Sequence, residues 1–464
     1  MKKKLLALGL GAILVAGSAA PAFAASQIDF SGFYRTVFAN EWNKNDDMGS
    51  NSEFRDRLQL NFGFHPTDEI SVFWTVRSPR GHTWGTNAAS DNERAALTNV
   101  HYYGQIKQDW GTLLIGRLAA DYSYYGLGSL GWNPGGVDGV VTEWGVFDLD
   151  GEFDGITYIN RWDNGFQLVG QFLRLEAAGP VNDPAGYDAQ TADLYILQPS
   201  YHWDEGGASL GLLYLRDKTG YVDTNYARGG LGLGPNEPAL TAYFLNPAFA
   251  HSFGDFSLHF EGMFGWAKAE IGGDDVKPKG YGLYLDGNYN YGPGNVTLAG
   301  WWTSGSDGDG NDEDPKNLVD MGLNALGGNG FRPLVVAYGD FNPNNMWNPS
   351  GSSDNVNAIM LANELSGGPD NVGSANHWGI ALAGSHAFTD DLALNYAAGY
   401  LALNKTAATA NGKTIGTELD LGIAVNLLDN LEFRSTAGYL IVGNAFGDDA
   451  KDMYSWYNTL YFRF

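Results

Sequence analysis

Hydrophobic and polar residues alternate one by one along much of the chain. Over residues 415–427 the odd positions are apolar or threonine, while the even positions include Glu418, Asp420 and Asn426. Residues 256–266 and 54–64 alternate in the same way. Successive side chains of a β-strand point to opposite faces, so this period of two predicts strands with one apolar and one polar face. A strand of a soluble sandwich shows the same pattern, but usually over fewer residues.

Short polar turns alternate with long loops in the connections between these stretches. The short turns lie near 66–68, 109–111, 163–165, 204–206, 254–255, 292–294, 389–391 and 428–430. The long loops cover 41–51, 79–94, 119–151, 177–190, 218–239, 272–279, 304–373, 404–413 and 443–451. Short turns at one end and long loops at the other are typical of a transmembrane barrel, with the short turns facing the periplasm.

These connections predict an all-β fold, a transmembrane antiparallel β-barrel of about 18 strands. An alternative of 16 strands stays open, because residues 190–218 alternate poorly and the loop 304–373 could hold a further hairpin. Beyond the apolar stretch at residues 5–17, no part of the sequence is long and apolar enough to be a membrane helix.

The first residues have the pattern of a cleavable secretory signal. Lys2, Lys3 and Lys4 precede an uncharged apolar stretch over 5–17, and small residues at Ala22 and Ala24 suit a signal peptidase. We therefore expect a signal peptide over 1–24 and a single barrel domain over 25–464.

The composition agrees with a secreted barrel. The chain has no cysteine, which excludes a disulfide framework, and its 64 glycines and 14% aromatic residues suit turns and membrane-interface girdles. The formal net charge of −26 argues against nucleic acid as a partner, because phosphates would repel the chain. The mean hydropathy of −0.24 is low for a membrane protein, but a barrel strand shows lipid only every second side chain.

Four arginines fall in predicted strands of the first third of the chain: Arg35, Arg57, Arg77 and Arg117. In the first three strands the apolar neighbours have the opposite parity, so we expect these arginines to face the water-filled interior. On the lipid face each would cost about 2–4 kcal/mol at mid-membrane. The pattern around Arg117 is mixed, since Leu113 and Ile115 share its parity.

The C-terminal strand resembles a known recognition signal. It ends on a terminal aromatic residue, Phe464, with Phe462 and Leu460 two and four positions before it on the same face. This ending resembles the signal that the outer-membrane barrel assembly machinery reads, and the resemblance implies that Phe462 and Phe464 carry it.

Residues 110–117, Trp-Gly-Thr-Leu-Leu-Ile-Gly-Arg, resemble the fifth strand of trimeric general diffusion porins. Phe33-Tyr34-Arg35 and the segment 54–58 are similar to the first two strands of that family, each with a basic wall residue. The chain is most similar to the homotrimeric major porins of sulfate-reducing bacteria. The resemblance implies a homotrimer integral to the outer membrane of a Gram-negative bacterium, in contact with lipid and lipopolysaccharide.

The resemblance also implies a water-filled channel for passive diffusion of small hydrophilic solutes and ions, with the third long loop, 119–151, folded into the lumen. Acids of this loop would face the arginines, and the candidates for this pore constriction are Asp138, Glu143 and Asp148. The Pro-Glu-Phe-Gly-Gly segment of the family is absent, so which acid faces the wall stays open. Arginines on the wall that face acids of the loop would give an electric field across the narrowest section of the pore. The alternative is that the arginines only hold the loop in place through ion pairs.

Two other functions fit the same barrel. Trp132, Trp144, Trp301 and Trp302 offer surfaces on which sugar rings could stack, as in a channel selective for sugars or organic acids. The long stretch 304–373 could instead plug the lumen, as in an adhesin or structural surface protein. We expect no enzyme, because Ser385 and His386 are neighbours on one strand and point to opposite faces.

An acidic segment over 307–314 is the candidate cation site. Asp307, Asp309 and Asn311 offer oxygen ligands at alternate positions, as Ca²⁺ prefers. The segment is not an EF-hand, because Gly310 falls at the fourth place rather than the sixth and Leu318 replaces the bidentate glutamate. A solvated acidic loop without an ion is the alternative, and we expect no other cofactor.

Overall fold

The computed structural model describes residues 27–43, 50–78, 82–83, 97–119, 152–178, 190–217, 240–271, 274–305, 334, 336, 376–406, 412–447 and 450–464. The strand segments are β1 (Gln27–Asn43), β2 (Ser50–His65), β3 (Ile70–Arg77), β4 (His82–Thr83), β5 (Thr98–Gln108), β6 (Gly111–Ala119), β7 (Glu152–Arg161), β8 (Phe166–Ala178), β9 (Gln190–Trp203), β10 (Gly206–Asp217), β11 (Leu240–Phe253), β12 (Phe256–Ile271), β13 (Asp274–Val276), β14 (Lys279–Asn290), β15 (Gly294–Thr303), β16 (His377–Thr389), β17 (Leu392–Leu403), β18 (Thr414–Leu428), β19 (Leu431–Val442) and β20 (Met453–Arg463). A short 3-10 turn, η2 (Asn444–Phe446), lies before β20.

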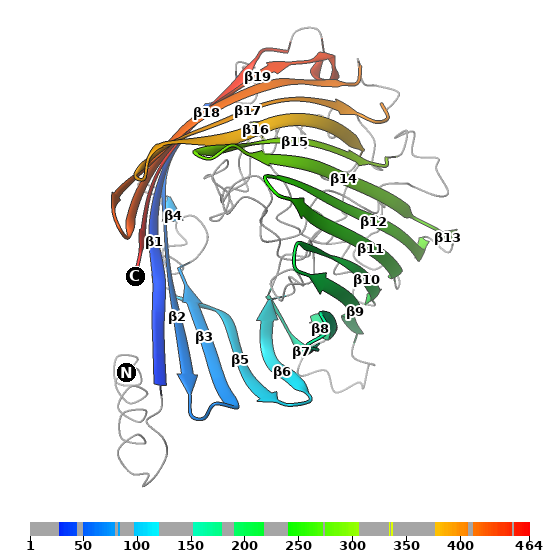
Figure 1. Ribbon diagram of the computed structural model, residues 1–464. Helices are drawn as coiled ribbons and strands as arrows, with labels where there is room; N and C mark the ends of the chain where they lie inside the picture. Colours follow the sequence, from blue (N-terminus) through cyan, green and yellow to red (C-terminus); the bar gives the residue numbers. More distant parts are fainter. Residues whose placement is uncertain are drawn as a thin grey trace, which may run out of the picture.

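The strands form one antiparallel sheet that closes on itself (Figure 1). The first strand, β1, pairs with β2 on one side and with the last strand, β20, on the other. Segments β3 and β4 both pair with β2 and share one position, and β13 extends the pairing of β12 beyond β14. The 20 segments therefore occupy 18 positions, which confirms the predicted strand number.

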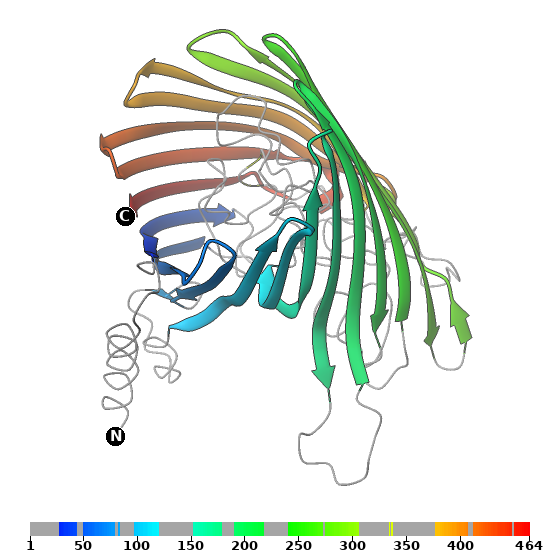
Figure 2. The same cartoon turned by 60° about the horizontal axis from the view of Figure 1, so that its bottom comes forward.

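The predicted alternation of short and long connections is also present (Figure 2). All eight short turns join strands that pair directly, as at Gly165 between β7 and β8. Gly165 has a φ of 86°, and a Cβ there would lie 2.1 Å from the carbonyl oxygen of His202, so the turn requires glycine. β15 pairs directly with β16, so the connection between them adds no strand to the barrel.

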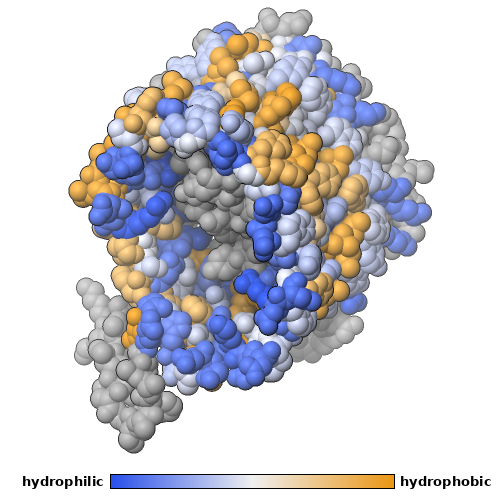
Figure 3. All heavy atoms as spheres, in the orientation of Figure 1, coloured by the Kyte–Doolittle hydropathy of each residue, from blue (hydrophilic) through white to orange (hydrophobic). Residues whose placement is uncertain are grey.

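The two faces of the sheet have opposite chemistry. In β18, Leu419 and Leu421 are 52% and 57% exposed on the outer face, whereas Glu418 and Asp420 are buried on the inner face. In Figure 3, hydrophobic residues spread over the outer surface and hydrophilic residues gather around the opening. An apolar outer face is typical of a barrel whose outer side chains meet lipid. Closure of the sheet also pairs the backbone N–H and C=O groups of its strands, which lipid could not hydrogen-bond. In the part of the chain that the structure describes, no helix could span a membrane.

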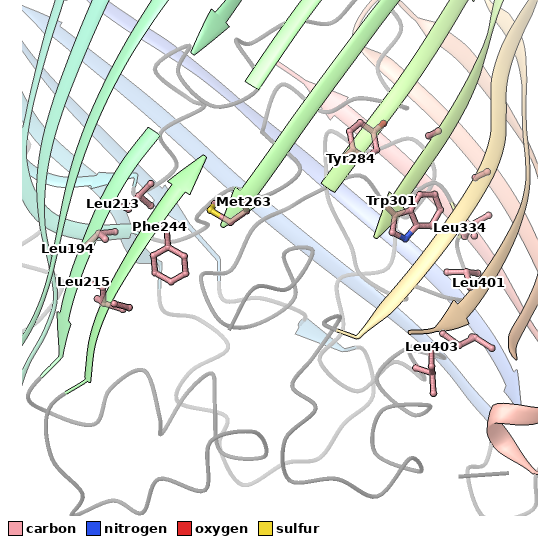
Figure 4. Packing of buried hydrophobic residues seen from close by; sticks show 14 of the residues in the cluster. Leu194, Leu213, Leu215, Phe244, Met263, Tyr284, Trp301, Leu334, Leu401 and Leu403 are labelled. Atoms are coloured by element: carbon pink, nitrogen blue, oxygen red, sulfur yellow. The ribbon is translucent and has the colours of Figure 1, made fainter. Parts of the chain in front are cut away.

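Part of the inner face is apolar as well. Leu194, Leu215 and Phe244 point inward from β9, β10 and β11, and Trp301 and Leu401 point inward from β15 and β17 (Figure 4). All five are almost completely buried. The interior is thus divided between apolar regions and the polar regions described below.

Candidate functional site

Arg35, Arg57 and Arg77 lie on the inner face of three neighbouring strands. Arg35 of β1 stands directly opposite Arg57 of β2, and Arg77 of β3 stands opposite Gln59. The Nε atom of Arg77 donates a hydrogen bond to Oε1 of Gln59 at 2.8 Å. Arg35 and Arg57 are only 5% and 8% exposed. The sequence pattern placed all three side chains on this face, while their role in a constriction stays a prediction.

A fourth arginine joins this group from the other end of the chain. β19 reaches β1 through β20, and Arg434 of β19 lies on the inner face. Arg434 forms an ion pair with Glu432, and the charges of Arg57, Arg77 and Arg434 all act on Arg35. We call these four residues, Arg35, Arg57, Arg77 and Arg434, the arginine wall. Parity within β19 would have placed Arg434 inward, but only barrel closure brings it beside Arg35.

Arg117 lies on the outer face, so its expected inward orientation is wrong. It stands opposite Tyr102, which is 46% exposed, and opposite the exposed Asp154. Leu114 and Leu118, which have the other parity, are buried in the interior. The regular alternation of β6 continues through Arg117 and carries it to the same face as Ile115.

A second polar group lies on the inner face of β12 and β14. Nδ1 of His259 lies 3.1 Å from Oδ2 of Asp286, and Nδ2 of Asn246 donates to Oε1 of Glu261 at 3.1 Å. His259, Glu261 and Asp286 are almost fully buried, and we call these three the acid–histidine cluster. The sequence pattern does not predict this cluster, because strand register rather than sequence spacing brings His259 opposite Asp286.

The arginine wall and the acid–histidine cluster lie on opposite sides of the barrel. Eight strand positions separate β2 from β12 in either direction around the closed sheet (Figure 1). Positive side chains thus line one side of the interior, and a cluster that includes two carboxylates lies on the other. This separation of charge arises within the described wall itself, without any contribution from the third loop.

A short piece of the connection between β15 and β16 also lies inside the barrel. Leu334 and Val336 are buried, and the backbone N–H of Val336 donates to Oε1 of Glu418 at 2.6 Å. A Cβ at Gly399 would lie 2.7 Å from Cδ1 of Leu334, so this glycine makes room for the segment. Figure 4 shows Leu334 between Trp301 and Leu401. Part of the stretch 304–373 therefore packs against β17 and β18.

Several predicted residues lie outside the described residues. These are the loop acids Asp138, Glu143 and Asp148 and the cation candidates Asp307, Asp309 and Asn311. Within the described ranges, no group of three or more acidic or histidine side chains could hold a metal ion. Trp301 points inward, whereas Trp302 has the opposite parity and stands opposite the exposed Trp378. These two tryptophans cannot form one stacking surface together.

The two residues of the C-terminal signal lie at the seam of the barrel. The backbone N–H of Gly32 donates to the carbonyl of Phe464 at 2.8 Å, and the N–H of Phe464 donates back at 3.0 Å. The ring of Phe464 lies 5.6 Å from that of Phe30 and 5.7 Å from that of Phe462. The chain end thus joins the first strand directly, while its recognition by the assembly machinery stays a prediction.

Comparison with known proteins places the fold among outer-membrane porins. The structure is similar to Acinetobacter baumannii OccAB1, with a TM-score of 0.53, 12% identity and coverage of 97% of this chain and 99% of that one. It is also similar to Pseudomonas aeruginosa OccK11 (OpdR), with a TM-score of 0.52, 10% identity and coverage of 94% and 95%. The outer membrane protein opdK of Pseudomonas aeruginosa matches with a TM-score of 0.52, 11% identity and coverage of 94% and 99%.

The search against family models found no match, and the search of curated proteins found none either. The predicted kinship with the trimeric porins of sulfate-reducing bacteria is therefore still a prediction. What the geometry and the structural neighbours establish together is the architecture: the chain has the 18-stranded β-barrel fold of outer-membrane porins.

Proposed function

We propose that the chain forms a water-filled channel in the outer membrane of a Gram-negative bacterium and lets small hydrophilic solutes and ions diffuse through it. The observation that supports this most is the arginine wall inside a closed barrel with an apolar outer face. Arg434 is paired with Glu432, and like charges on the four neighbouring arginines repel one another less where water also surrounds them. A water-filled path along this wall would provide that screening.

The arginine wall favours anions among the solutes that could pass. A row of fixed positive charges raises the local concentration of negative ions and lowers that of positive ones. A channel selective for small organic acids is therefore our second candidate function. The division of Trp301 and Trp302 between the two faces gives less support to a sugar channel with a stacking surface.

The remaining expectations belong to the same proposal. We expect a homotrimer, insertion by the barrel assembly machinery, and no catalytic activity. Three chains in an unheated gel sample or in a native mass measurement would support the trimer. A monomer as the sole species in mild detergent would contradict it.

Planar-bilayer recordings of the mature chain test the channel. We expect open channels with a reversal potential that favours anions in a salt gradient. Arg57→Gln combined with Arg77→Gln should shift selectivity toward cations, because two inner charges disappear. Arg117→Gln is the control, since this arginine lies on the outer face, and should leave the reversal potential unchanged.

Two results would contradict the proposal. A wild-type barrel that conducts almost no current would indicate a plugged structural protein. An unchanged reversal potential in the Arg57→Gln, Arg77→Gln variant would mean that ions do not pass the arginine wall, and the inferred anion preference would be wrong.

A further inference from the structure

A fifth arginine lies close to the arginine wall, at the end of the barrel that carries the short turns. Arg463 of β20 has the parity of the buried Thr459, whereas Leu460, of the other parity, is 41% exposed on the outer face. The side chain of Arg463 is itself 57% exposed, so much of its guanidinium is open to the interior. Its backbone N–H donates to the carbonyl of Asn430 in the turn between β18 and β19, which fixes the residue at this end of the barrel.

Two aromatic rings support the arginines of this region. The ring of Phe33 on β1 lies 5.4 Å from the ring of Tyr461 on β20. The guanidinium carbon of Arg463 lies 4.7 Å from the centroid of Tyr461, and that of Arg35 lies 5.9 Å from the centroid of Phe33. A guanidinium on the face of a ring is attracted to it and still presents N–H groups along its own edge. The pair of rings therefore holds one arginine on each side.

One carboxylate lies between two of the inner arginines. Oε1 of Glu432 on β19 forms an ion pair with Nε of Arg434, and Oε2 of Glu432 lies 4.0 Å from Nη2 of Arg463. The side chains of Glu432 and Arg434 are only 14% and 12% exposed. Glu432 thus presents one oxygen to each of two guanidinium groups. A carboxylate that arrived from solution would need the same kind of partners, because arginine binds both oxygens of a carboxylate well.

The two contacts of Glu432 are of different kinds. The contact with Arg434 is close, whereas 4.0 Å is too long for a hydrogen bond to Arg463. A guanidinium has five N–H donors, so Arg463 can bind a second carboxylate while Glu432 stays with Arg434. The negative charge of Glu432 repels that second carboxylate and so weakens its binding.

Weak binding at this place has a physical use in a channel. Conduction requires that a solute binds strongly enough to enter and weakly enough to leave. The arginine wall attracts anions, and an anion would be held too long if every arginine were uncompensated. Arg463 lies where β20 meets the short turns, so a solute passes it as it enters or leaves the barrel on that side.

We propose that Arg434 and Arg463 form a binding site for solute carboxylates, and that Glu432 limits how tightly the site holds them. The solute carboxylate takes N–H donors of Arg463, beside the ring of Tyr461, and Glu432 acts as an internal competitor that speeds its release. This inference rests on the proposed channel and goes beyond it, because it names a solute class, a site and a residue that sets the affinity.

Block of the chloride current by succinate tests the site in planar-bilayer recordings at low salt. Succinamide, which has nearly the same shape without the charges, is the comparison and should not block. Glu432→Gln keeps an acceptor for Arg434 but loses the negative charge. We expect the half-blocking concentration of succinate to fall about fivefold in this variant, as for the loss of one opposing charge.

Asp29→Asn is the matched control, because it also removes one carboxylate from the inner face near the short turns. Asp29 pairs with His65 at 3.0 Å, and we expect its variant to stay within about twofold of wild type. Glu432→Asp keeps the charge and should lie closer to wild type than Glu432→Gln does. Adding Arg463→Gln to Glu432→Gln should abolish the tighter block, because the guanidinium that faces the solute is then absent.

Three results would overturn the proposal. They are an unchanged half-blocking concentration in Glu432→Gln, an equal fall in Asp29→Asn, and stronger block by inorganic phosphate than by succinate. Calorimetric titration of the full mature barrel with succinate in detergent measures the same site without a current. Binding that tightens in Glu432→Gln, in a barrel that does not conduct, would support the site and contradict only the proposed channel.

Discussion

The arginine wall and the acid–histidine cluster both place ionisable side chains on the inner face of the barrel, away from lipid, but they differ in how the charges are arranged. In the arginine wall, like charges face each other across neighbouring strands, as Arg35 faces Arg57. In the cluster, His259 faces Asp286 and can share a proton or a charge with it.

The two groups also come from different parts of the chain. β12 and β14 follow one another in sequence, so the cluster can form as soon as this hairpin pairs. The arginine wall combines β1, β2 and β3 with β19, and it is complete only when β20 closes the barrel. The acid–histidine cluster therefore depends on the pairing of one hairpin, whereas the arginine wall depends on the closed barrel.

The largest expected effect comes from opening the seam beside the arginine wall. Deleting Phe464 removes both backbone hydrogen bonds to Gly32 and the contact with Phe30, so the end of β20 loses its attachment to β1. We expect a several-fold lower amount of heat-modifiable barrel in the outer-membrane fraction. Phe253→Ala, which removes an exposed ring on the outer face next to the β11–β12 turn, is the control. Equal assembly of the truncated chain and the parent would refute this role of the C-terminus.

Breaking the acid–histidine cluster should have the next largest effect, on stability. His259→Leu leaves the buried carboxylate of Asp286 without its partner, which costs about 3–5 kcal/mol in comparable buried pairs. Urea unfolding of the barrel in lipid measures this loss. Changing both residues to leucine should recover most of it, because the carboxylate of Asp286, which the single change leaves without His259, is then absent as well. If the double variant is as unstable as the single one, the pair does not act as a unit.

Replacing Arg434 tests the part of the arginine wall that β19 contributes. We expect Arg434→Gln to shift selectivity toward cations by about twofold, in the same direction as the variants on β2 and β3 but less strongly, because Glu432 already offsets part of its charge. Reversal potentials should show the shift at 0.1 M salt and much less at 1 M, since the screening length falls from about 10 Å to about 3 Å. A shift that persists at 1 M would speak against a screened electrostatic effect.

The smallest expected effect concerns the segment at 334–336. Glu418→Gln keeps an acceptor for the N–H of Val336 but removes the charge, so we expect the contact to weaken by about 1 kcal/mol. Single-channel recordings should show slightly larger or noisier currents. Glu418→Leu should increase the effect, and Asp420→Asn on the same face is the control. Identical recordings for all three would indicate that this segment does not border the conducting path.

The fold could be predicted from the sequence because its information is local. The alternation within each strand identifies its inner and outer faces. In the centre of β18, buried residues such as Glu418 alternate with exposed residues such as Leu419, as predicted. The short turns are equally local, since glycine and polar residues define them one at a time. The strand number then followed from counting connections.

The candidate site needed information that no single strand carries. Parity placed Arg35, Arg57 and Arg77, but Arg434 joined them only through closure, and His259 met Asp286 only through register. Arg117 was misplaced because a resemblance in residues 110–117 outweighed the parity of Leu113 and Ile115. A charge on an outward position is unexpected inside an apolar band, yet here it belongs to a row that continues through Asp154 and Arg174.

That row has a mechanical consequence for the membrane around the barrel. Outward apolar and aromatic residues run from Phe256 to Trp266 on β12, but only from Phe166 to Phe172 on β8, where the outward Arg174 follows opposite Asp193. The four residues of difference correspond to about 13 Å along a strand, or about 10 Å in height for strands tilted by 35–45°. The apolar band on the outer face is therefore taller at β12 than at β8. A bilayer of uniform thickness can match it only by thinning beside β8 or by letting the barrel lean toward that side.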